Sequence, residues 1–397
     1  MSQRVATSTI LGRAIQYKYH DPKAVYNARD IITDMNKQFG LDWTYWKAHR
    51  AKLKALKMVR GDPTESYAEI PRYLHMLTQS NPGSIVNLQK TVDGHFQYAF
   101  VALNSSIQGW VNCRPVVIVD GSFLKAAYHG TFLTASCQDA GDLPHYACMW
   151  HLWKNIKENF RRNQLQLREI YYAMARAYTV QDFDYYMAEV NRIDHRVKTY
   201  LYEIGYSKWS RAHSTSNRTM TMISNIAKSL NSATKDARDL PATRLLEEMC
   251  KLIEKWNYDK SKEALYTNTK LTAKYESILA DNLEIALHMM VRPSSDYLHT
   301  VTHMGKTFIV CIKAKTCTCQ QFQLDELPCP HDLAVLHKKG LDGDDYSSLC
   351  YTKENMMKTY DISVHPMPNE STWDLPQEVA EEILLHPIVT DKMFVVD

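Results

Sequence analysis

Several features are missing from this chain of 397 residues, and their absence narrows its class. No apolar segment reaches the length of a transmembrane helix, so the sequence predicts no membrane partner. Residues 1–15 contain no uninterrupted apolar stretch of signal-peptide length. No internal repeat or low-complexity tract is present. Hydrophobic residues make up 45% and charged residues 23%, an ordinary globular balance that predicts two or three domains.

A strong charge of either sign is also missing. The net charge of +3 is too small to be evidence for a nucleic-acid partner. Whether the chain binds nucleic acid must therefore be judged from local basic patches. Nine cysteines, an odd number without a signal peptide, argue against a disulfide framework and for a reducing compartment. Reduced thiols remain available as metal ligands.

Two pairs of metal-ligating residues stand out late in the chain. Cys317 and Cys319 form one pair, Cys329 and His331 the other, and nine residues separate them. Three thiolates and one imidazole are suited to tetrahedral Zn²⁺. A short helix over 332–337 is expected to hold His331 near its start. Unrelated cysteines in an ordinary core are the alternative, but the paired spacing favours a structural Zn²⁺ site.

A basic helix is predicted near the start of the chain. Three helices are expected in residues 8–60, and Gly40 separates the second from a third over 43–60. This arrangement is typical of a helix-turn-helix. The third helix has no acid between Asp42 and Asp62, so it can neutralise phosphates. A solvated basic face on a packing helix is the alternative. The candidate DNA-binding residues are Thr44, Lys47, Arg50, Lys52, Lys54 and Lys57.

Strands are expected after a single helix over 64–80. Residues 85–92 and 95–103 flank an Asp-Gly turn and predict a hairpin. Apolar runs at 115–120 and 131–138 predict two buried strands.

The region 148–290 is expected to be mainly helical because it contains few glycines and prolines. Strands resume at 297–303 and 307–314. The segment from Asp361 contains several prolines and is expected to pack loosely. Candidate helices span 148–163, 167–178, 181–193, 196–204, 218–236, 241–258 and 262–287.

Asp120 ends the apolar run 115–120, a position typical of metal-ion nucleases and transposases. Such enzymes need two or three carboxylates that converge on Mg²⁺, and one carboxylate cannot do this alone. A turn or cap residue is the alternative for an isolated aspartate.

Several motifs, taken in order, resemble the Mutator-like element transposases of plants. Residues 119–125, 128–133 and 138–140 resemble the opening of their catalytic domain. The segment Cys148-Met-Trp-His151 resembles its Cys-x-x-His segment. The two metal-ligating pairs resemble the SWIM-type zinc finger of these transposases. The resemblance covers nearly the whole chain.

The resemblance implies an α+β fold, a nuclear location and DNA as a partner. The implied parts are a helix-turn-helix-like bundle, a truncated ribonuclease H-like sheet, a large helical insertion, a small SWIM-type zinc finger and a tail. These parts correspond to residues 1–80, 81–147, 148–290, 291–350 and 351–397.

Two departures from the family pattern predict that catalysis is lost. The family has an Asp-Asp-Glu triad, and the stretch bearing its second Asp is missing, because residues 141–144 alone join Ala140 to His145. Lys228 stands where the family usually has Glu, and a cation there would repel Mg²⁺. Asp120 is therefore expected to be vestigial. Without central strands, the sheet is expected to expose edges and apolar faces.

The sequence thus predicts a zinc-binding, transposase-derived protein with DNA affinity and no transposase catalysis. The alternative is an active Mg²⁺-dependent transposase that cuts DNA through Asp120 and further acids that the sequence does not identify.

Overall fold

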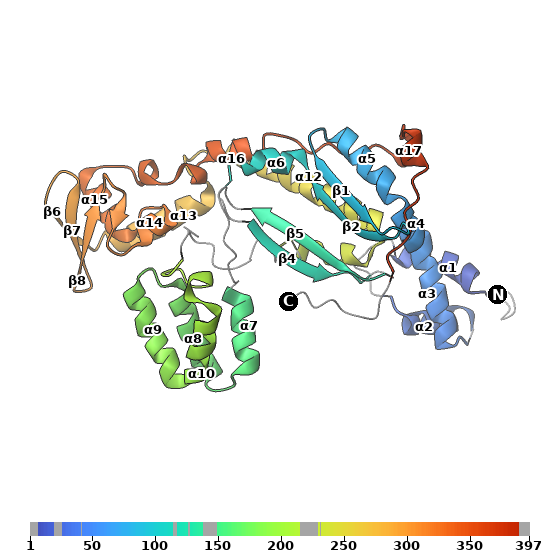
Figure 1. Ribbon diagram of the computed structural model, residues 1–397, viewed down its shortest axis with the longest axis horizontal. Coiled ribbons are helices and arrows are strands. Elements are labelled where there is room, and N and C mark those ends of the chain that lie inside the picture. Colours follow the sequence, from blue (N-terminus) through green and yellow to red (C-terminus); the bar gives the residue numbers. More distant parts are fainter. Residues whose placement is uncertain are drawn as a thin grey trace.

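The computed structural model describes residues 7–19, 26–40, 42–113, 117–125, 128–137, 149–214, 229–230 and 232–388. These ranges are mainly helical with small antiparallel sheets, which confirms a mixed helix and sheet fold. No helix in them is both long and apolar enough to cross a membrane. The short join after Ala140 and Lys228 lie outside the described residues. An N-terminal helical bundle and the metal-ligating pairs lie at opposite ends of the long axis (Figure 1).

The N-terminal bundle packs around small residues. Ala48, Ala51 and Ala55 of α3 are fully buried. A Cβ added to Gly12 of α1 would lie only 3.1 Å from the Lys54 Cβ, so α1 and α3 approach closely. The second helix begins in a capping box at Asn27. The elements are α1 (Ser8–Ile15), η1 (Gln16–Tyr19), α2 (Ala28–Phe39) and α3 (Tyr45–Arg60).

The helix expected over 64–80 is two helices. The first, α4 (Pro63–Ala68), ends before α5 (Ile70–Ser80) begins. Pro71 causes the break because it has no N–H to donate to the Tyr67 carbonyl and its ring crowds that carbonyl. The single-helix prediction was wrong for this reason. A further short helix, α6 (Asn104–Trp110), was not predicted.

Both strand pairs expected in the central region form. For the second pair, the prediction of buried strands was wrong, because Val119 and Leu133 are exposed, and Asp120 lies in the middle of its strand instead of at the end. The hairpin consists of β1 (Ile85–Lys90) and β2 (Phe96–Ala102) in antiparallel register. The second pair, β4 (Val117–Phe123) and β5 (Thr131–Cys137), is also antiparallel. Among the described strands, the two pairs are separate two-stranded sheets.

The β4–β5 pair turns an apolar face outward, as expected for a sheet without further strands. Val119, Phe123 and Leu133 lie on this face and are 61%, 74% and 67% exposed. On the opposite face, Ser122 and Thr134 are buried. Phe132, on the same face as Ser122 and Thr134, packs against a cluster that includes Leu245 and Met249. Within the described residues, the hairpin therefore has apolar side chains on both faces, and one of these faces is exposed.

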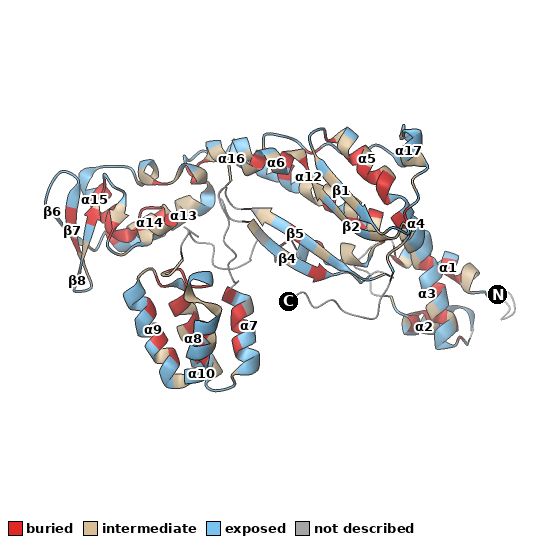
Figure 2. Cartoon of the chain, in the orientation of Figure 1, coloured by how far each residue is buried: buried red, intermediate tan, exposed pale blue. Residues whose placement is uncertain are grey.

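A helical region with its own core follows. Its largest buried side chains, Tyr171, Phe183 and Trp209, lie between the helices, whose inward faces are buried in Figure 2. The helices are α7 (Met149–Asn159), α8 (Gln164–Arg176), α9 (Val180–Ile193) and α10 (His195–Ile204), followed by η2 (Tyr206–Lys208).

The later helices differ from the predicted boundaries. The long helix α12 (Ala242–Tyr266) continues through the expected break near residue 260, and six residues separate it from α13 (Ala273–Ala286). The actual break lies at Thr267, whose hydroxyl donates to the Glu263 carbonyl at 2.8 Å. Threonine and asparagine side chains here compete with helical hydrogen bonding, whereas no glycine or proline lies near residue 260. A single turn, η3 (Ala237–Asp239), precedes α12.

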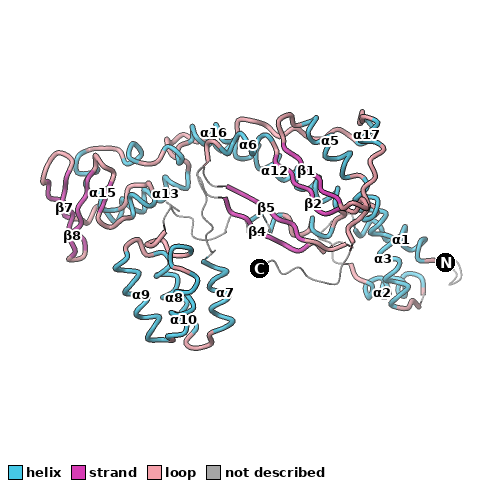
Figure 3. The backbone as a smooth tube through the Cα atoms, in the orientation of Figure 1, coloured by secondary structure: helices cyan, strands magenta, loops and turns pink. Residues whose placement is uncertain are grey.

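The prediction of a loosely packed tail was wrong for the described residues up to 388. Val364 is 7% and Leu384 1% exposed in a core shared with α5 and β2. Asn81 exchanges two hydrogen bonds with the backbone of His365, at 3.0 and 2.8 Å. Figure 3 traces the tail mainly as loop. Prolines limit regular structure there without preventing packing.

Short helical elements follow the metal-ligating pairs. They are η4 (Gly343–Tyr346), η5 (Leu349–Tyr351), α16 (Lys353–Thr359), η6 (Glu370–Thr372) and α17 (Gln377–Ala380).

Candidate metal centre

The metal-ligating pairs lie between a small sheet and a helix. The sheet has the strand order β6-β7-β8-β9, and Cys317 on β9 pairs with Val310 on β8. Pro330 occupies the first helical position of α15, where its missing N–H costs nothing, so Cys329 and His331 lie at the helix start as expected. The elements are β6 (Met290–Pro293), β7 (Leu298–His303), β8 (Lys306–Cys311), β9 (Thr316–Cys317), α14 (Gln321–Asp325) and α15 (Pro330–Lys339).

The four predicted ligands converge. The Sγ atoms of Cys319 and Cys329 are 3.4 Å apart. His331 Nδ1 lies 3.6 Å from the Cys329 Sγ and 3.7 Å from the Cys317 Sγ. A tetrahedral zinc with ordinary bond lengths separates two sulfurs by about 3.8 Å and a sulfur from a nitrogen by about 3.6 Å. All four ligand atoms lie within 4.8 Å of one another, so the cluster fits a structural Zn²⁺.

Electrostatics within the cluster favours a bound cation. Hydrogen bonding with Cys317 and Cys329 lowers the pKa of Cys319. The hydrogen bond shared with Cys319 raises the pKa of Cys317, and burial raises the pKa of Cys329. Without a cation between them, the three sulfurs compete for ionisation. Zinc, when bound, compensates the charge of all three thiolates in this buried site.

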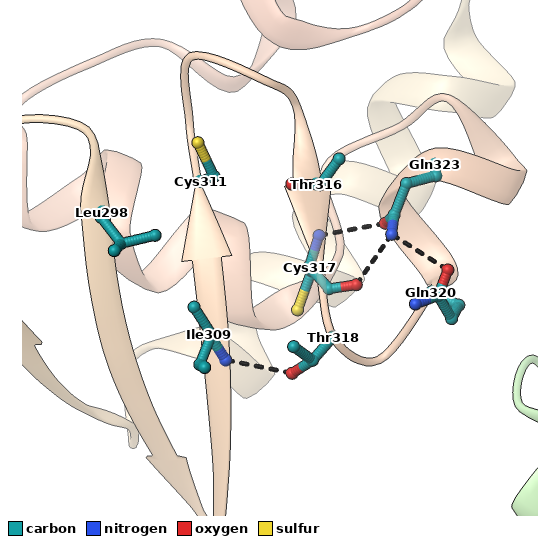
Figure 4. A pocket seen from close by; sticks show the side chains of 8 residues that line it. All are labelled: Leu298, Ile309, Cys311, Thr316, Cys317, Thr318, Gln320 and Gln323. Carbon is teal, nitrogen blue, oxygen red and sulfur yellow. Dashed lines mark hydrogen bonds between the residues drawn. The ribbon is translucent and has the colours of Figure 1, made fainter.

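Gln323 holds the backbone of a ligand. Its Oε1 accepts a 3.0 Å hydrogen bond from the Cys317 N–H, and its Nε2 donates to the Cys317 carbonyl at 2.9 Å. The side chain thus occupies the outer edge of β9 as a neighbouring strand would (Figure 4). A hollow of about 300 Å³ lies beside this edge, lined by residues that include Leu298 and Ile309. The clamp fixes the orientation of Cys317 toward the cluster.

The imidazole is held by aromatic packing. The rings of Phe308 and His331 are stacked with centroids 3.8 Å apart. Asp332 is fully buried, and its Oδ2 lies 2.8 Å from the Cys329 Sγ, within hydrogen-bonding distance. Burial raises the pKa of Asp332 to about 8. A protonated carboxyl at this position adds no second negative charge beside the thiolates.

A β-hairpin and a following helix that present three thiolates and an imidazole define a small zinc finger. Residues 308–340 match the family model of the SWIM zinc finger, which confirms the finger expected from the spacing. No curated protein and no solved structure matches the chain.

The predicted catalytic residue lies far from this cluster in the sequence, on β4. Asp120 pairs with Thr134 across the hairpin, and its Oδ1 accepts a 3.0 Å hydrogen bond from the Gly121 N–H. In the part of the chain that the structure describes, the Cys/His cluster is the one group of three or more acidic, cysteine or histidine side chains placed to hold a metal. No further carboxylates converge on Asp120 within that part.

The candidate DNA-binding residues lie on or just before α3, and several have partners within the protein. The Lys47 Nζ lies 4.3 Å from the ring centroid of Trp43. Lys54 donates to the Thr9 hydroxyl, and Lys57 pairs with Asp62. Thr44 and Arg50 are exposed, and Lys52 is half-buried.

Two supporting residues, Gln323 and Phe308, were missed by sequence reasoning. Glutamine and phenylalanine are not zinc ligands, so nothing in the sequence marks these two residues. Their roles depend on how β8, β9 and α14 pack.

Proposed function

We propose that this chain is a zinc-binding protein derived from a Mutator-like transposase, which binds DNA in the nucleus without catalysing transposition. The observation that carries the proposal is the SWIM zinc finger, assembled at residues 308–340 with all four ligands together. The ordered motifs that resemble these transposases support the origin. The three-helix bundle supports a helix-turn-helix role for α2 and α3, and β4–β5 is proposed as a ribonuclease H-like remnant.

DNA binding is proposed for the bundle because α3 combines basic side chains with an absence of acids. Lys52, Lys54 and Lys57 would neutralise phosphates, so duplex affinity should fall as salt rises. Fluorescence anisotropy with a labelled duplex measures this dependence. Replacing the three lysines by alanine should weaken binding and flatten the salt slope by about 0.9 for each phosphate that is no longer neutralised.

The matched control replaces three exposed lysines of the helical region, Lys157, Lys198 and Lys208, by alanine. It removes the same charge from another surface. Equal affinity losses in the two triple variants would mean that net charge, rather than α3, determines binding. Absence of any binding by the zinc-loaded protein would reject the DNA role.

The absence of catalysis is proposed because the described residues bring no second and third carboxylate to Asp120. Two hard cations need several carboxylates that act as one unit. The test incubates zinc-loaded protein and duplex with Mg²⁺ and compares it with Asp120→Asn. No strand cleavage is expected from either. Cleavage that requires both Mg²⁺ and Asp120 would support the active-transposase alternative.

A further inference from the structure

An exposed stripe runs along α3, opposite its buried side. Four exposed residues recur at spacings of three or four: Trp46, Arg50, Leu53 and Lys57. Because an α-helix turns about 100° per residue, these four residues lie within an arc of about 60°. The fully buried residues Ala48, Ala51 and Ala55 lie about 160° around the helix. Since α1 and α2 pack on α3, the outer stripe is the side that α3 presents to solvent.

The outer stripe combines large apolar side chains with cations. Trp46 is 69% exposed and Leu53 51%. The ring of Trp46 contacts His49 edge-on at 6.1 Å between centroids, which limits its freedom before any partner binds. Arg50 lies between the two apolar residues along the helix. The ion pair between Lys57 and Asp62 is partly exposed, so Lys57 can exchange it for a phosphate at little cost.

We propose that the outer stripe enters the major groove of B-form DNA, with Trp46 and Leu53 against thymine methyl groups and Arg50 and Lys57 on backbone phosphates. This inference rests on the proposed DNA binding and deepens it, because it adds base contact by apolar residues to the phosphate contact of the lysines. Lys47 and Lys52 flank the buried side of α3 and lie outside the outer stripe, where they would reach phosphates at the edge of the groove and no base.

The groove chemistry fits this assignment. The major groove of B-form DNA is about 12 Å wide and admits a helix of about 10–12 Å diameter. The thymine C5-methyl is the apolar group that this groove presents, and it suits Trp46 and Leu53. The major groove of A-form RNA is too deep and narrow for side chains to read. With seven cationic or imidazole side chains and no acid on α3, an anionic partner is favoured over a neutral one.

The experiment uses two AT-rich duplexes of identical sequence, one with thymine and one with uracil, which lacks the methyl group. The zinc-loaded full chain is expected to bind the thymine duplex about threefold to fourfold more tightly for each methyl contact. The double variant Trp46→Ala, Leu53→Ala should bind both duplexes equally. Because both side chains are exposed, the variant keeps the buried core of the bundle. Leu165→Ala, at a residue 82% exposed on α8, is the control and should still discriminate.

Each outcome decides a different claim. If the wild-type chain binds both duplexes with equal affinity, DNA binding stands and the methyl contact is overturned. If it binds neither duplex, the proposed function and this inference both fall. If the double variant keeps the thymine preference but abolishes a self-association seen by sedimentation, the outer stripe is a face between two copies of the chain and the inference is overturned.

Discussion

The Tyr178 hydroxyl donates a 2.6 Å hydrogen bond to Oδ2 of Asp325, and this bond joins the helical region to the zinc finger. Asp325 is 1% exposed and lies in the segment between the two ligand pairs. The guanidinium of Arg211 lies 4.4 Å from the Tyr178 ring centroid. Burial and the neighbouring Asp325 carboxylate raise the pKa of Tyr178, so its hydroxyl stays a donor. We therefore expect docking of the helices and order in the finger to be coupled.

Tyr178→Phe should loosen this docking without releasing zinc. It removes the donor to a buried carboxylate, which typically costs about 1–3 kcal/mol. Hydrogen exchange should become faster in α8 and α14, and metal analysis should still find the zinc of the wild type. Tyr185→Phe, at a residue 63% exposed on α9, is the control and should leave exchange unchanged. Unaltered protection of α14 in Tyr178→Phe would show that the two regions are held together by other contacts.

Zinc removal should unfold the finger. The purified chain should contain about one zinc ion, and Cys329→Ser should release it. Cys317 and Cys329 are buried in one hydrophobic cluster with Val301 and Val310, and Cys319 is partly buried beside them. Loss of the ion leaves these three thiols without their common partner. Chelation should then expose residues 308–340 to protease.

The control for this prediction is Cys350→Ser, which changes a half-buried cysteine outside the ligand set and should retain zinc. A metal-free wild-type protein with the same protease resistance would count against a structural role for the ion.

The ligands of the finger were predictable because their signal is local. Cys317 and Cys319 lie one residue apart, as do Cys329 and His331, and this spacing survives any error in the neighbouring elements. The contact between Tyr178 and Asp325 joins positions 147 residues apart, and no pattern in the sequence pairs them.

Element boundaries were less predictable, because they depend on competition between local hydrogen bonds. The break at Thr267 requires its hydroxyl to turn back to the Glu263 carbonyl, a choice that periodicity does not reveal. The packed tail depends on Asn81, whose side chain binds the backbone of His365 from a distant helix end. Tertiary contacts of this kind override the expectation that prolines favour loose packing.

Gln323→Ala should weaken zinc binding although Gln323 is not a ligand. The side chain clamps both backbone groups of Cys317, and removal of a supporting residue typically lowers metal affinity about 10-fold to 100-fold. Competition with a chromophoric chelator measures this change. Gln323→Glu keeps the acceptor for the Cys317 N–H and loses the donor to the Cys317 carbonyl. Its zinc affinity should therefore lie between those of the wild type and Gln323→Ala. Equal zinc affinity in the wild type, Gln323→Ala and Gln323→Glu would show that the hydrogen bonds between Gln323 and Cys317 do not support zinc binding.

Acid should destabilise the helical region through Asp194. Hydrogen bonds from Arg196 lower the pKa of this carboxyl from 3.8 to about 2. A depressed folded-state pKa contributes stability above pH 3.8, and this contribution is lost as the pH falls from 3.8 to about 2. Asp194→Asn keeps an acceptor that caps α10 but loses the charge. The variant should melt roughly a few degrees lower at pH 6, with the difference shrinking by pH 2.5. Asp184→Asn, at an exposed position, is the control. A difference independent of pH would show that the charge of Asp194 does not contribute to stability.

Gly12→Val should separate α1 from α3 and expose the alanine face that the bundle buries. A Cβ at position 12 would lie 3.2 Å from the Ala51 carbonyl oxygen and 3.3 Å from the Ala55 nitrogen, both of them backbone atoms. Backbone cannot rotate away as a side chain can, so the two helices must move apart, and overpacking of this kind costs about 1–3 kcal/mol.

Ala14→Val places the same β-branched residue at an exposed position of α1 and controls for helix propensity. Hydrogen exchange should show faster opening of α1 and α3 in Gly12→Val than in Ala14→Val. Equal exchange in both would mean that α1 and α3 already have room for a side chain. Because the outer stripe lies on the opposite side of α3, Gly12→Val should lower DNA affinity only as far as it unfolds the bundle.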